Sequence, residues 1–168
     1  MGGSNVIIRR SSIADAEACT AYMNSFVDEG LDTMPTQRYP VAEWADFIQK
    51  ASTKERGFFL LAFDGPLVVG SLELLRGEKP TNCHVGQLGM SVIQSYRKQG
   101  LGRRLVETAL LEVKNWPGFC RIELDVVPWN TPAIHLYESM GFVREGTKRK
   151  AADFRGEPHD LVMMALVW

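Results

Sequence analysis

The stretch Arg97-Lys98-Gln99-Gly100-Leu101-Gly102 decides how the rest of this chain is interpreted. It follows an apolar run over residues 84–93 and precedes residues 103–111, whose apolar spacing predicts a helix. A strand, a glycine turn and a helix start together favour phosphate binding. Glycine lets the backbone approach a ligand, the first helical amides lack partners, and the helix dipole attracts an anion. Positive charge around this turn comes from Arg97, Lys98, Arg103 and Arg104.

Composition limits the classes of protein to consider. A length of 168 residues favours one domain spanning residues 1–168. The 19 Lys and Arg residues nearly balance the 20 Asp and Glu residues, so no bulk attraction to nucleic acid is expected. No run approaches the roughly 20 apolar residues of a membrane span. We therefore expect neither nucleic acid nor a membrane as a partner.

The cysteines and the N-terminus favour a cytoplasmic protein. The three cysteines, Cys19, Cys83 and Cys120, are odd in number and far apart. This spacing argues against a disulfide framework and against a Cys-x-x-Cys metal site, so we expect no metal. Residues 1–6 carry no basic region followed by an apolar core, so no signal peptide is expected. Reduced thiols are typical of the cytoplasm.

Periodicity predicts an alternation of strands and helices in the order β-α-α-β-β-β-α-β-α-β-β. The expected strands are 6–9, 57–63, 66–75, 84–93, 121–127, 142–150 and 161–167, with residues 153–158 connecting the last two. The expected helices follow Ser12, start near Pro40, run from 101 to Trp116, and run from a cap at Asn130 to Gly141. The early strands predict an antiparallel meander. The helix between strands 84–93 and 121–127 predicts a parallel crossover.

Two common phosphate-binding motifs do not fit the glycine turn. A nucleotide P-loop needs Gly-Lys followed by Ser or Thr, but Gly102 is followed by Arg103. A dinucleotide fingerprint needs a third glycine where this chain has Leu105. The pattern present is an arginine, two residues, a glycine, one residue and a second glycine.

This pattern resembles the pyrophosphate loop of the GNAT superfamily, the acyl-CoA-dependent N-acyltransferases. Two further stretches carry the resemblance. Met90-Ser91-Val92 stands where the family has its I-x-V strand end, and residues 130–142 match the family segment N-x-x-A-I-x-L-Y-x-x-x-G-F. The resemblance implies an α/β (α+β) GNAT fold. That fold has a mixed, mostly antiparallel sheet of about seven strands, four flanking helices and a splayed parallel pair at the CoA site.

The resemblance also implies roles for particular residues. Amides from Arg97 to Arg103 would hold the pyrophosphate of acetyl-CoA, the co-substrate, and the backbone of Met90 to Val92 would pair with the pantetheine arm. A backbone N–H near Met90 would stabilise the oxyanion, and Tyr137 would be the general acid. The implied cofactor-binding residues are Met90, Ser91, Val92, Arg97, Lys98, Gln99, Gly100, Gly102, Arg103, Asn130 and Tyr137.

Several of these positions have plainer alternatives. Tyr137 also fits a core tyrosine on a helix stripe, and Asn130 also fits a plain helix cap. For the general base the candidates are Glu73, which points away from Leu72 and Leu74, and His84, or else a water chain. Glu73 is the expected catalytic residue beside Tyr137.

The acceptor is expected between the 28–39 loop, the meander and the 144–160 hairpin. Asp28, Glu29 and Asp32 would attract a cationic amine, whereas Arg38 and Arg155 would bind a carboxylate. The other polar groups in reach, Glu123 and Asp125, share one strand face and suit surface charges or substrate contacts.

The leading hypothesis is a cytoplasmic N-acetyltransferase that moves the acetyl group of acetyl-CoA to a small primary amine by direct transfer in a ternary complex. The C-terminal part looks like bacterial enzymes acting on amino acids or related amines. The alternatives are a protein N-terminal or lysine acetyltransferase, and a catalytically silent acyl-CoA-binding sensor. A homodimer is the default oligomer.

Overall fold

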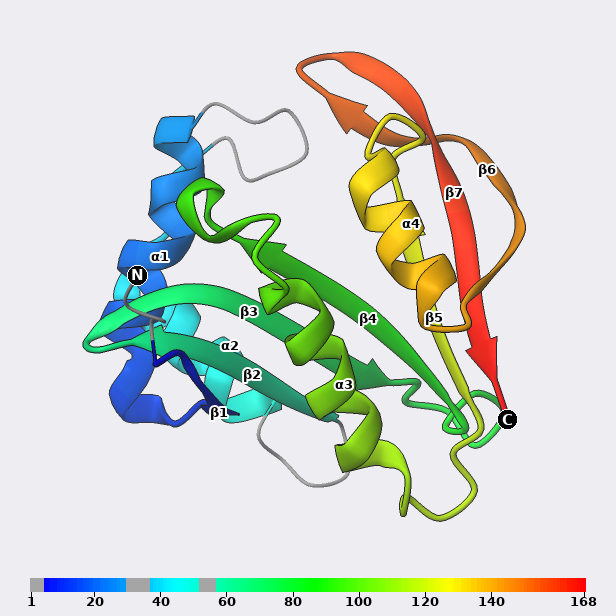
Figure 1. Cartoon of the computed structure of the whole chain (residues 1–168), viewed down its shortest axis with the longest axis horizontal. Coiled ribbons are helices and arrows are strands. Elements are labelled where there is room, and N and C mark those ends of the chain that lie inside the picture. The colour runs from blue at the N-terminus through cyan, green and yellow to red at the C-terminus, as the bar shows by residue number, and fades with distance from the viewer. Residues whose placement is uncertain (1–4, 30–36, 52–56) are drawn as a thin grey trace.

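The computed structural model describes residues 5–29, 37–51 and 57–168. Within them the chain forms a seven-stranded sheet flanked by four α-helices (Figure 1). The strands are β1 (Ile7–Arg10), β2 (Gly57–Asp64), β3 (Leu67–Arg76), β4 (Val85–Val92), β5 (Arg121–Val126), β6 (Val143–Phe154) and β7 (Glu157–Val167). The helices are α1 (Ala16–Glu29), α2 (Val41–Ala51), α3 (Leu101–Val113) and α4 (Thr131–Ser139), with 3₁₀ turns η1 (Ile13–Asp15) and η2 (Gln94–Tyr96). The predicted order of elements is confirmed.

The sheet is mixed and mostly antiparallel, as predicted. Its strand order is β1-β2-β3-β4-β5-β7-β6. Strands β1 to β4 form the expected antiparallel meander, and β4 pairs with β5 in parallel. Strand β7 lies between β5 and β6, so the final hairpin folds back beside β5. The GNAT-like architecture expected from the sequence is confirmed.

Two predicted boundaries are wrong. The expected connection over residues 153–158 is mostly strand, because β6 and β7 meet at a two-residue turn of Arg155 and Gly156. Both turn residues have positive φ angles, 57° and 84°, as a tight hairpin with the twist of its strands requires. Helix α3 ends at Val113, earlier than Trp116, whose ring instead packs edge-on against Phe58 and Phe119.

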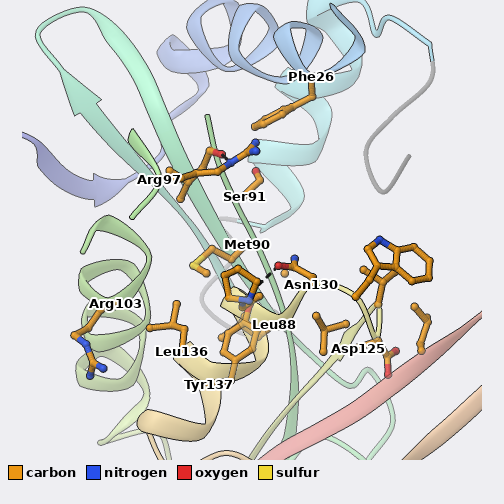
Figure 2. A pocket seen from close by; sticks show the side chains of 18 of the residues that line it. Phe26, Leu88, Met90, Ser91, Arg97, Arg103, Asp125, Asn130, Leu136 and Tyr137 are labelled. Carbon is orange, nitrogen blue, oxygen red and sulfur yellow. Dashed lines mark hydrogen bonds between the residues drawn. The ribbon is translucent and has the colours of Figure 1, made fainter. Parts of the chain in front are cut away.

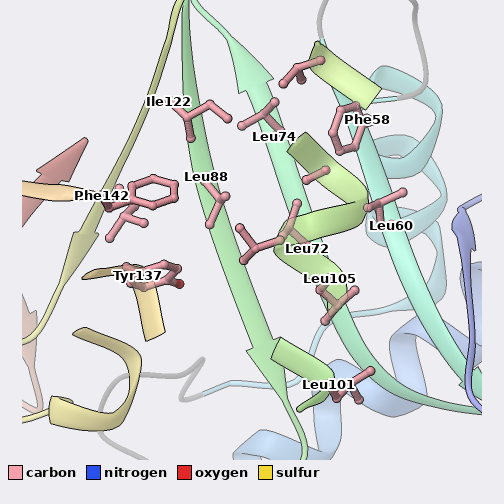
Figure 3. Close-up of a cluster of buried hydrophobic side chains, with 14 of the residues drawn as sticks. Phe58, Leu60, Leu72, Leu74, Leu88, Leu101, Leu105, Ile122, Tyr137 and Phe142 are labelled. Carbon is pink, nitrogen blue, oxygen red and sulfur yellow. The ribbon is translucent and has the colours of Figure 1, made fainter. Parts of the chain in front are cut away.

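The core has two layers, one on each face of the sheet. On one face, α3 and α4 pack on the central strands through buried residues such as Leu72, Leu105 and Ile134 (Figure 3). On the other face, α1 and α2 pack through Phe26, Ile48 and Phe59. The sheet is therefore covered on both faces, and a ligand that reaches its centre must enter where two strands separate.

Leu105→Ala tests the layer under α3. Leu105 is fully buried, so truncation removes apolar contacts and leaves a cavity. We expect a loss of about 2–5 kcal/mol in the free energy of unfolding, measured by urea denaturation. The control is Leu111→Ala in the same helix, where the side chain is 71% exposed and the change should stay within about 0.5 kcal/mol. Equal losses in both variants would contradict this account of the core.

Candidate active site

The parallel pair β4–β5 separates after a short contact. Its register joins Val85 to Arg121, Gly86 to Ile122 and Gln87 to Glu123, and pairing ends there. Beyond these residues the two strands diverge toward their C-terminal ends (Figure 1). The splayed pair expected from the family resemblance is therefore present. The second half of β4 has an edge that no strand covers.

The main-chain groups on this open edge come from alternate residues. The amide of Ile93 bonds the carbonyl of Val69 at 3.2 Å, so odd-numbered residues of β4 face β3. The main-chain N–H and C=O groups of Leu88, Met90 and Val92 therefore face the gap. The carbonyl of Val92 already accepts a bond from Arg97 Nε at 2.8 Å. The N–H groups of Met90 and Val92 and the carbonyl of Met90 are left as the groups suited to pairing with an extended ligand.

Ser91 takes a different position from its two neighbours. Its main-chain groups face β3, and the Tyr22 hydroxyl donates to its carbonyl at 2.8 Å. Its own hydroxyl shares a bond with Tyr22 Oη at 2.7 Å and with Ser71 Oγ at 3.0 Å. Ser91 lines the cavity, but its main-chain groups point to β3 and not to the open edge. The expected backbone pairing of residues 90–92 is therefore limited to Met90 and Val92. The serine instead anchors α1 to the end of β4.

The start of α3 has the conformation expected of an anion site. Gly100, the residue before the helix, is left-handed with φ 81°, and Lys98 also has a positive φ of 58°. The first hydrogen bond of the helix runs from the amide of Arg104 to the carbonyl of Gly100 at 3.1 Å. Among the residues that the structure describes, the amides from Lys98 to Arg103 have no acceptor. A Cβ on Gly102 would lie 3.1 Å from Leu136 Cδ2, so a glycine allows α3 and α4 to meet closely here.

The four positive side chains of this stretch do not act together. Arg97 is tied to Val92 and to Glu29, with Nη2 to Oε2 at 3.0 Å. Arg103 donates to Ser139 Oγ at 2.7 Å. Arg104 is turned away from the turn and donates to the carbonyl of Val6 at 2.6 Å. The expectation that Arg104 adds charge around the glycine turn is therefore wrong, because the side chain fixes β1.

One cavity of about 840 Å³ joins the gap to the start of α3 (Figure 2). Cavities of this size are typical of small-molecule and cofactor sites. Its lining includes most of the residues predicted from the sequence, namely Met90, Ser91, Val92, Arg97, Lys98, Gly100, Arg103, Asn130 and Tyr137. Gln99, Gly102, Glu73 and His84 do not line it. Gln99 closes the turn instead, through a bond to the carbonyl of Ser95 at 2.7 Å.

Asn130 and Tyr137 reach this cavity from the start of α4 and from its C-terminal half, respectively. Tyr137 is buried, and this burial raises the pKa of its phenol. Its ring packs against Phe142, with centroids 5.5 Å apart, so it is also part of the core (Figure 3). Asn130 caps α4 by accepting from the amide of Ala133 at 3.3 Å. Both plainer roles considered for these residues are thus realised, and both side chains still line the cavity.

Glu73 lies on the opposite face of the sheet from Tyr137. It pairs with Gly89 across β3 and β4, and a Cβ on Gly89 would lie 2.7 Å from Glu73 Oε1. The carboxylate therefore extends over β4 in space that only a glycine leaves open. Burial raises the pKa of Glu73. His84 precedes the paired beginning of β4, at the end of the strand away from the gap, which separates it from the cavity.

Other groups that the sequence predicts near the acceptor form ion pairs with side chains of the protein. Asp28 and Arg38 bond each other at 2.5 Å on the surface, and Glu29 holds Arg97. Asp32 lies outside the described residues. Asp125 lines the cavity and accepts from Lys148 Nζ at 2.8 Å.

Sequence reasoning missed the aromatic lining contributed by Phe26, Trp129 and Phe154. Of these three residues, only Trp129 lies beside a feature that the sequence predicts, the helix cap at Asn130.

Two further kinds of feature are absent from the described ranges. No group of three or more His, Cys, Asp or Glu side chains there could hold a metal ion. No helix there is long and apolar enough to cross a membrane.

Comparison with known proteins gives consistent relatives. The family model described as "Acetyltransferase (GNAT) family" matches residues 20–142. The L-amino acid N-acetyltransferase AaaT of Escherichia coli is 36% identical over 60% of this chain, which spans only 62% of that protein. Phosphinothricin N-acetyltransferase of Streptomyces viridochromogenes is 28% identical over 93% of this chain and 84% of its own length. A putative acetyltransferase from Salmonella typhimurium, solved with its cofactor acetyl-CoA, has the same fold with a TM-score of 0.83 at 18% identity, covering 96% of this chain and 93% of that one.

The family model covers more than half of the chain and includes the splayed strands, the glycine turn and α4. This chain therefore belongs to the GNAT family of acetyltransferases.

Proposed function

We propose that this protein transfers the acetyl group of acetyl-CoA to the primary amine of a small molecule, an amino acid or a related amine. Transfer is direct, with both substrates bound together. The observation that carries the proposal is one cavity that joins three features. These are the open edge of β4, the start of α3, whose first amides have no acceptor among the described residues, and the Tyr137 side chain of α4. Relatives named for amino-acid and phosphinothricin acetylation support a small acceptor.

Acetyl-CoA occupies the cavity from two directions in this proposal. The pyrophosphate accepts bonds from the amides of residues 98–103, where the helix dipole also favours negative charge. The pantetheine arm adds to the open edge of β4 as an extra strand through Met90 and Val92. The Asn130 side chain contacts the same arm. This arrangement delivers the thioester carbonyl to the N–H of Met90.

The transfer step then follows from the chemistry of a thioester. The neutral amine attacks the acyl carbon, the C–N bond forms and the C–S bond breaks. The N–H of Met90 stabilises the developing oxyanion, a type of contact worth about 2.7–4 kcal/mol. Tyr137 protonates the leaving sulfur, and the proton lost by the amine passes toward Glu73 through water. The products are an N-acetyl amide and free CoA.

Glu73 suits the role of proton acceptor because of its raised pKa. A carboxylate in water is a weak base, and burial brings its pKa closer to neutrality. The side chain lies over Gly89, which lines the cavity, and in this proposal water carries the proton from the amine across that short separation. His84 is outside that region.

A cytoplasmic location, a homodimer and a single domain over residues 1–168 belong to the same proposal. Acetyl-CoA supply and reduced thiols favour the cytoplasm. Sedimentation of the purified protein tests the dimer, and a single cooperative unfolding transition tests the single domain.

The direct test is a thiol-release screen with acetyl-CoA and amino acids, polyamines, aminoglycosides and short peptides. Release that depends on an added small amine supports the proposal. Release with peptides alone would identify a protein acetyltransferase. Acetyl-CoA binding without release for any acceptor would identify a silent sensor.

Gly100→Ala tests the anion site. Alanine in a left-handed conformation costs about 1–2 kcal/mol and displaces the amides that follow it. We expect CoA binding, measured by calorimetry, to weaken by about tenfold, which corresponds to about 1.4 kcal/mol. Gly118→Ala is the matched control, since Gly118 also has a positive φ, 66°, and open space around it but does not line the cavity. Unchanged CoA affinity in Gly100→Ala would remove the glycine turn from the binding site.

Tyr137→Phe tests the general acid. Removing the hydroxyl should lower kcat by about 10²-fold or more, because a positioned acid contributes that much. Acetyl-CoA affinity and the melting temperature should stay close to wild type, since the ring still fills the core. Tyr39→Phe removes a phenol hydroxyl outside the cavity and should not change kcat. A Tyr137→Phe enzyme with wild-type kcat would leave this tyrosine a packing residue.

Glu73→Gln tests the base through the pH profile. Wild-type kcat/KM should fall as pH drops through the raised pKa of Glu73, which lies above 4.5, because only the carboxylate accepts a proton. The glutamine variant should be slower at neutral pH and should lose that acidic limb. Glu43→Gln on α2 should keep the wild-type profile. If the limb persists in Glu73→Gln, another group is the base.

A further inference from the structure

Asp125, which lines the cavity, forms an ion pair with Lys148 from outside the lining and has one oxygen without a partner among the described residues. Asp125 Oδ2 accepts from Lys148 Nζ at 2.8 Å. Asp125 Oδ1 exposes less than 1 Å² and has no hydrogen-bond partner among the described residues. A buried carboxylate oxygen without a donor is unfavourable. Because Asp125 lines the cavity (Figure 2), a donor from a bound molecule would satisfy it.

Aromatic rings form a wall of the same cavity. Trp129 and Phe154 lie edge to face with centroids 6.2 Å apart, and His159 packs against both. Trp129 and Phe154 line the cavity, together with Leu161. The Trp129 side chain is 53% exposed, which is high for so large a ring. Apolar surface left open at a cavity is suited to packing an apolar group of a ligand.

The charges on this side of the cavity are matched in pairs. Asp125 is balanced by Lys148, and Arg97 is balanced by Glu29. Glu73 lies on the same face of the sheet, where it is the proton acceptor of the proposed reaction. A molecule with several positive charges would find few unpaired carboxylates among the described residues here. A molecule without net charge fits this balance better.

Register places Asp125 at the right depth to hold the reacting amine. Asp125 is two residues beyond Glu123, the last paired residue of β5, and Gly89 is two residues beyond its partner Gln87. Asp125 also alternates with Leu124 and Val126, which face α3 and α4, so its carboxylate lies on the same face as Glu73. An amine bonded to Asp125 would thus lie across the gap from Gly89 and next to the N–H of Met90.

We infer that the acceptor is a zwitterionic amino acid with an aromatic or large apolar side chain, bound by the Asp125–Lys148 pair. Its amine donates to the Asp125 carboxylate, which rotates to bring an oxygen to the cavity, and its carboxylate accepts from Lys148 Nζ, which has three donors and spends one on Asp125. Its side chain packs against Trp129 and Phe154. The two polar groups of an α-amino acid are held on one carbon, which matches two adjacent protein groups. This inference rests on the proposed acetyl transfer.

Lys148→Met tests the carboxylate contact. Thiol release is measured with L-phenylalanine and with 2-phenylethylamine, which has the same ring but no carboxylate. Wild type should prefer phenylalanine by at least about tenfold in kcat/KM. In Lys148→Met, the KM for phenylalanine should rise about tenfold or more, a loss typical of a charged hydrogen bond, while the KM for phenylethylamine should change far less because it has no carboxylate to lose the contact. Lys150→Met, on the same hairpin, is the matched control and should behave as wild type.

Trp129→Ala tests the aromatic wall with a variant whose half-exposed site tolerates truncation. It should lower kcat/KM for phenylalanine about tenfold relative to its effect on alanine as acceptor, because only the larger side chain reaches the ring. Equal effects on both acceptors would place the side chain elsewhere.

Calorimetry separates this inference from the proposed reaction. Phenylalanine should bind the complex with CoA, and Lys148→Met should weaken that binding even if no turnover occurs. Thiol release with polyamines or peptides in preference to amino acids, or equal losses for phenylalanine and phenylethylamine, would overturn the inference and keep acetyl transfer. Absence of thiol release with every amine would overturn the proposed function instead.

Discussion

The short parallel pairing between β4 and β5 is the constraint on which the rest of the site depends. Three residue pairs hold the strands together at one end, and the strands separate beyond Gln87 and Glu123. Backbone groups inside a protein must be paired, so an edge left open in the middle of a sheet requires a ligand, water or a side chain. Arg97 takes one such group, the carbonyl of Val92. In the proposed complex, the remaining main-chain groups of Met90 and Val92 pair with the extended arm of acetyl-CoA.

The gap also connects the two faces of the sheet, which carry different chemistry. On one face lie the start of α3, Tyr137 and Asn130, which suit a phosphate-bearing cofactor. On the other face lie Glu73 and Asp125, with the aromatic wall beside them. Because each residue of a strand points to the face opposite its neighbours, one strand supplies both sides. Met90 contacts the helix side, whereas Gly89 leaves room for Glu73 on the acceptor side.

Glycine therefore has two separate roles near this gap. Gly100 adopts a left-handed conformation that turns the chain into α3. Gly89 adopts an ordinary strand conformation and matters for the volume that it leaves free, since any Cβ there would meet the Glu73 carboxylate. The first role follows from a turn position in the sequence. The second depends on Glu73, a residue of the neighbouring strand sixteen positions earlier, and only the register reveals it.

The sequence by itself determined the order of elements, the glycine turn and the cap at Asn130. These features follow from local periodicity, turn chemistry and short motifs, which act within one element or between neighbours along the chain. Only the tertiary structure decided that β7 lies between β5 and β6, that Arg104 turns toward β1, and that Lys148 meets Asp125. Each of these depends on pairing between segments distant in sequence, where strand register, rather than local pattern, sets which side chains touch.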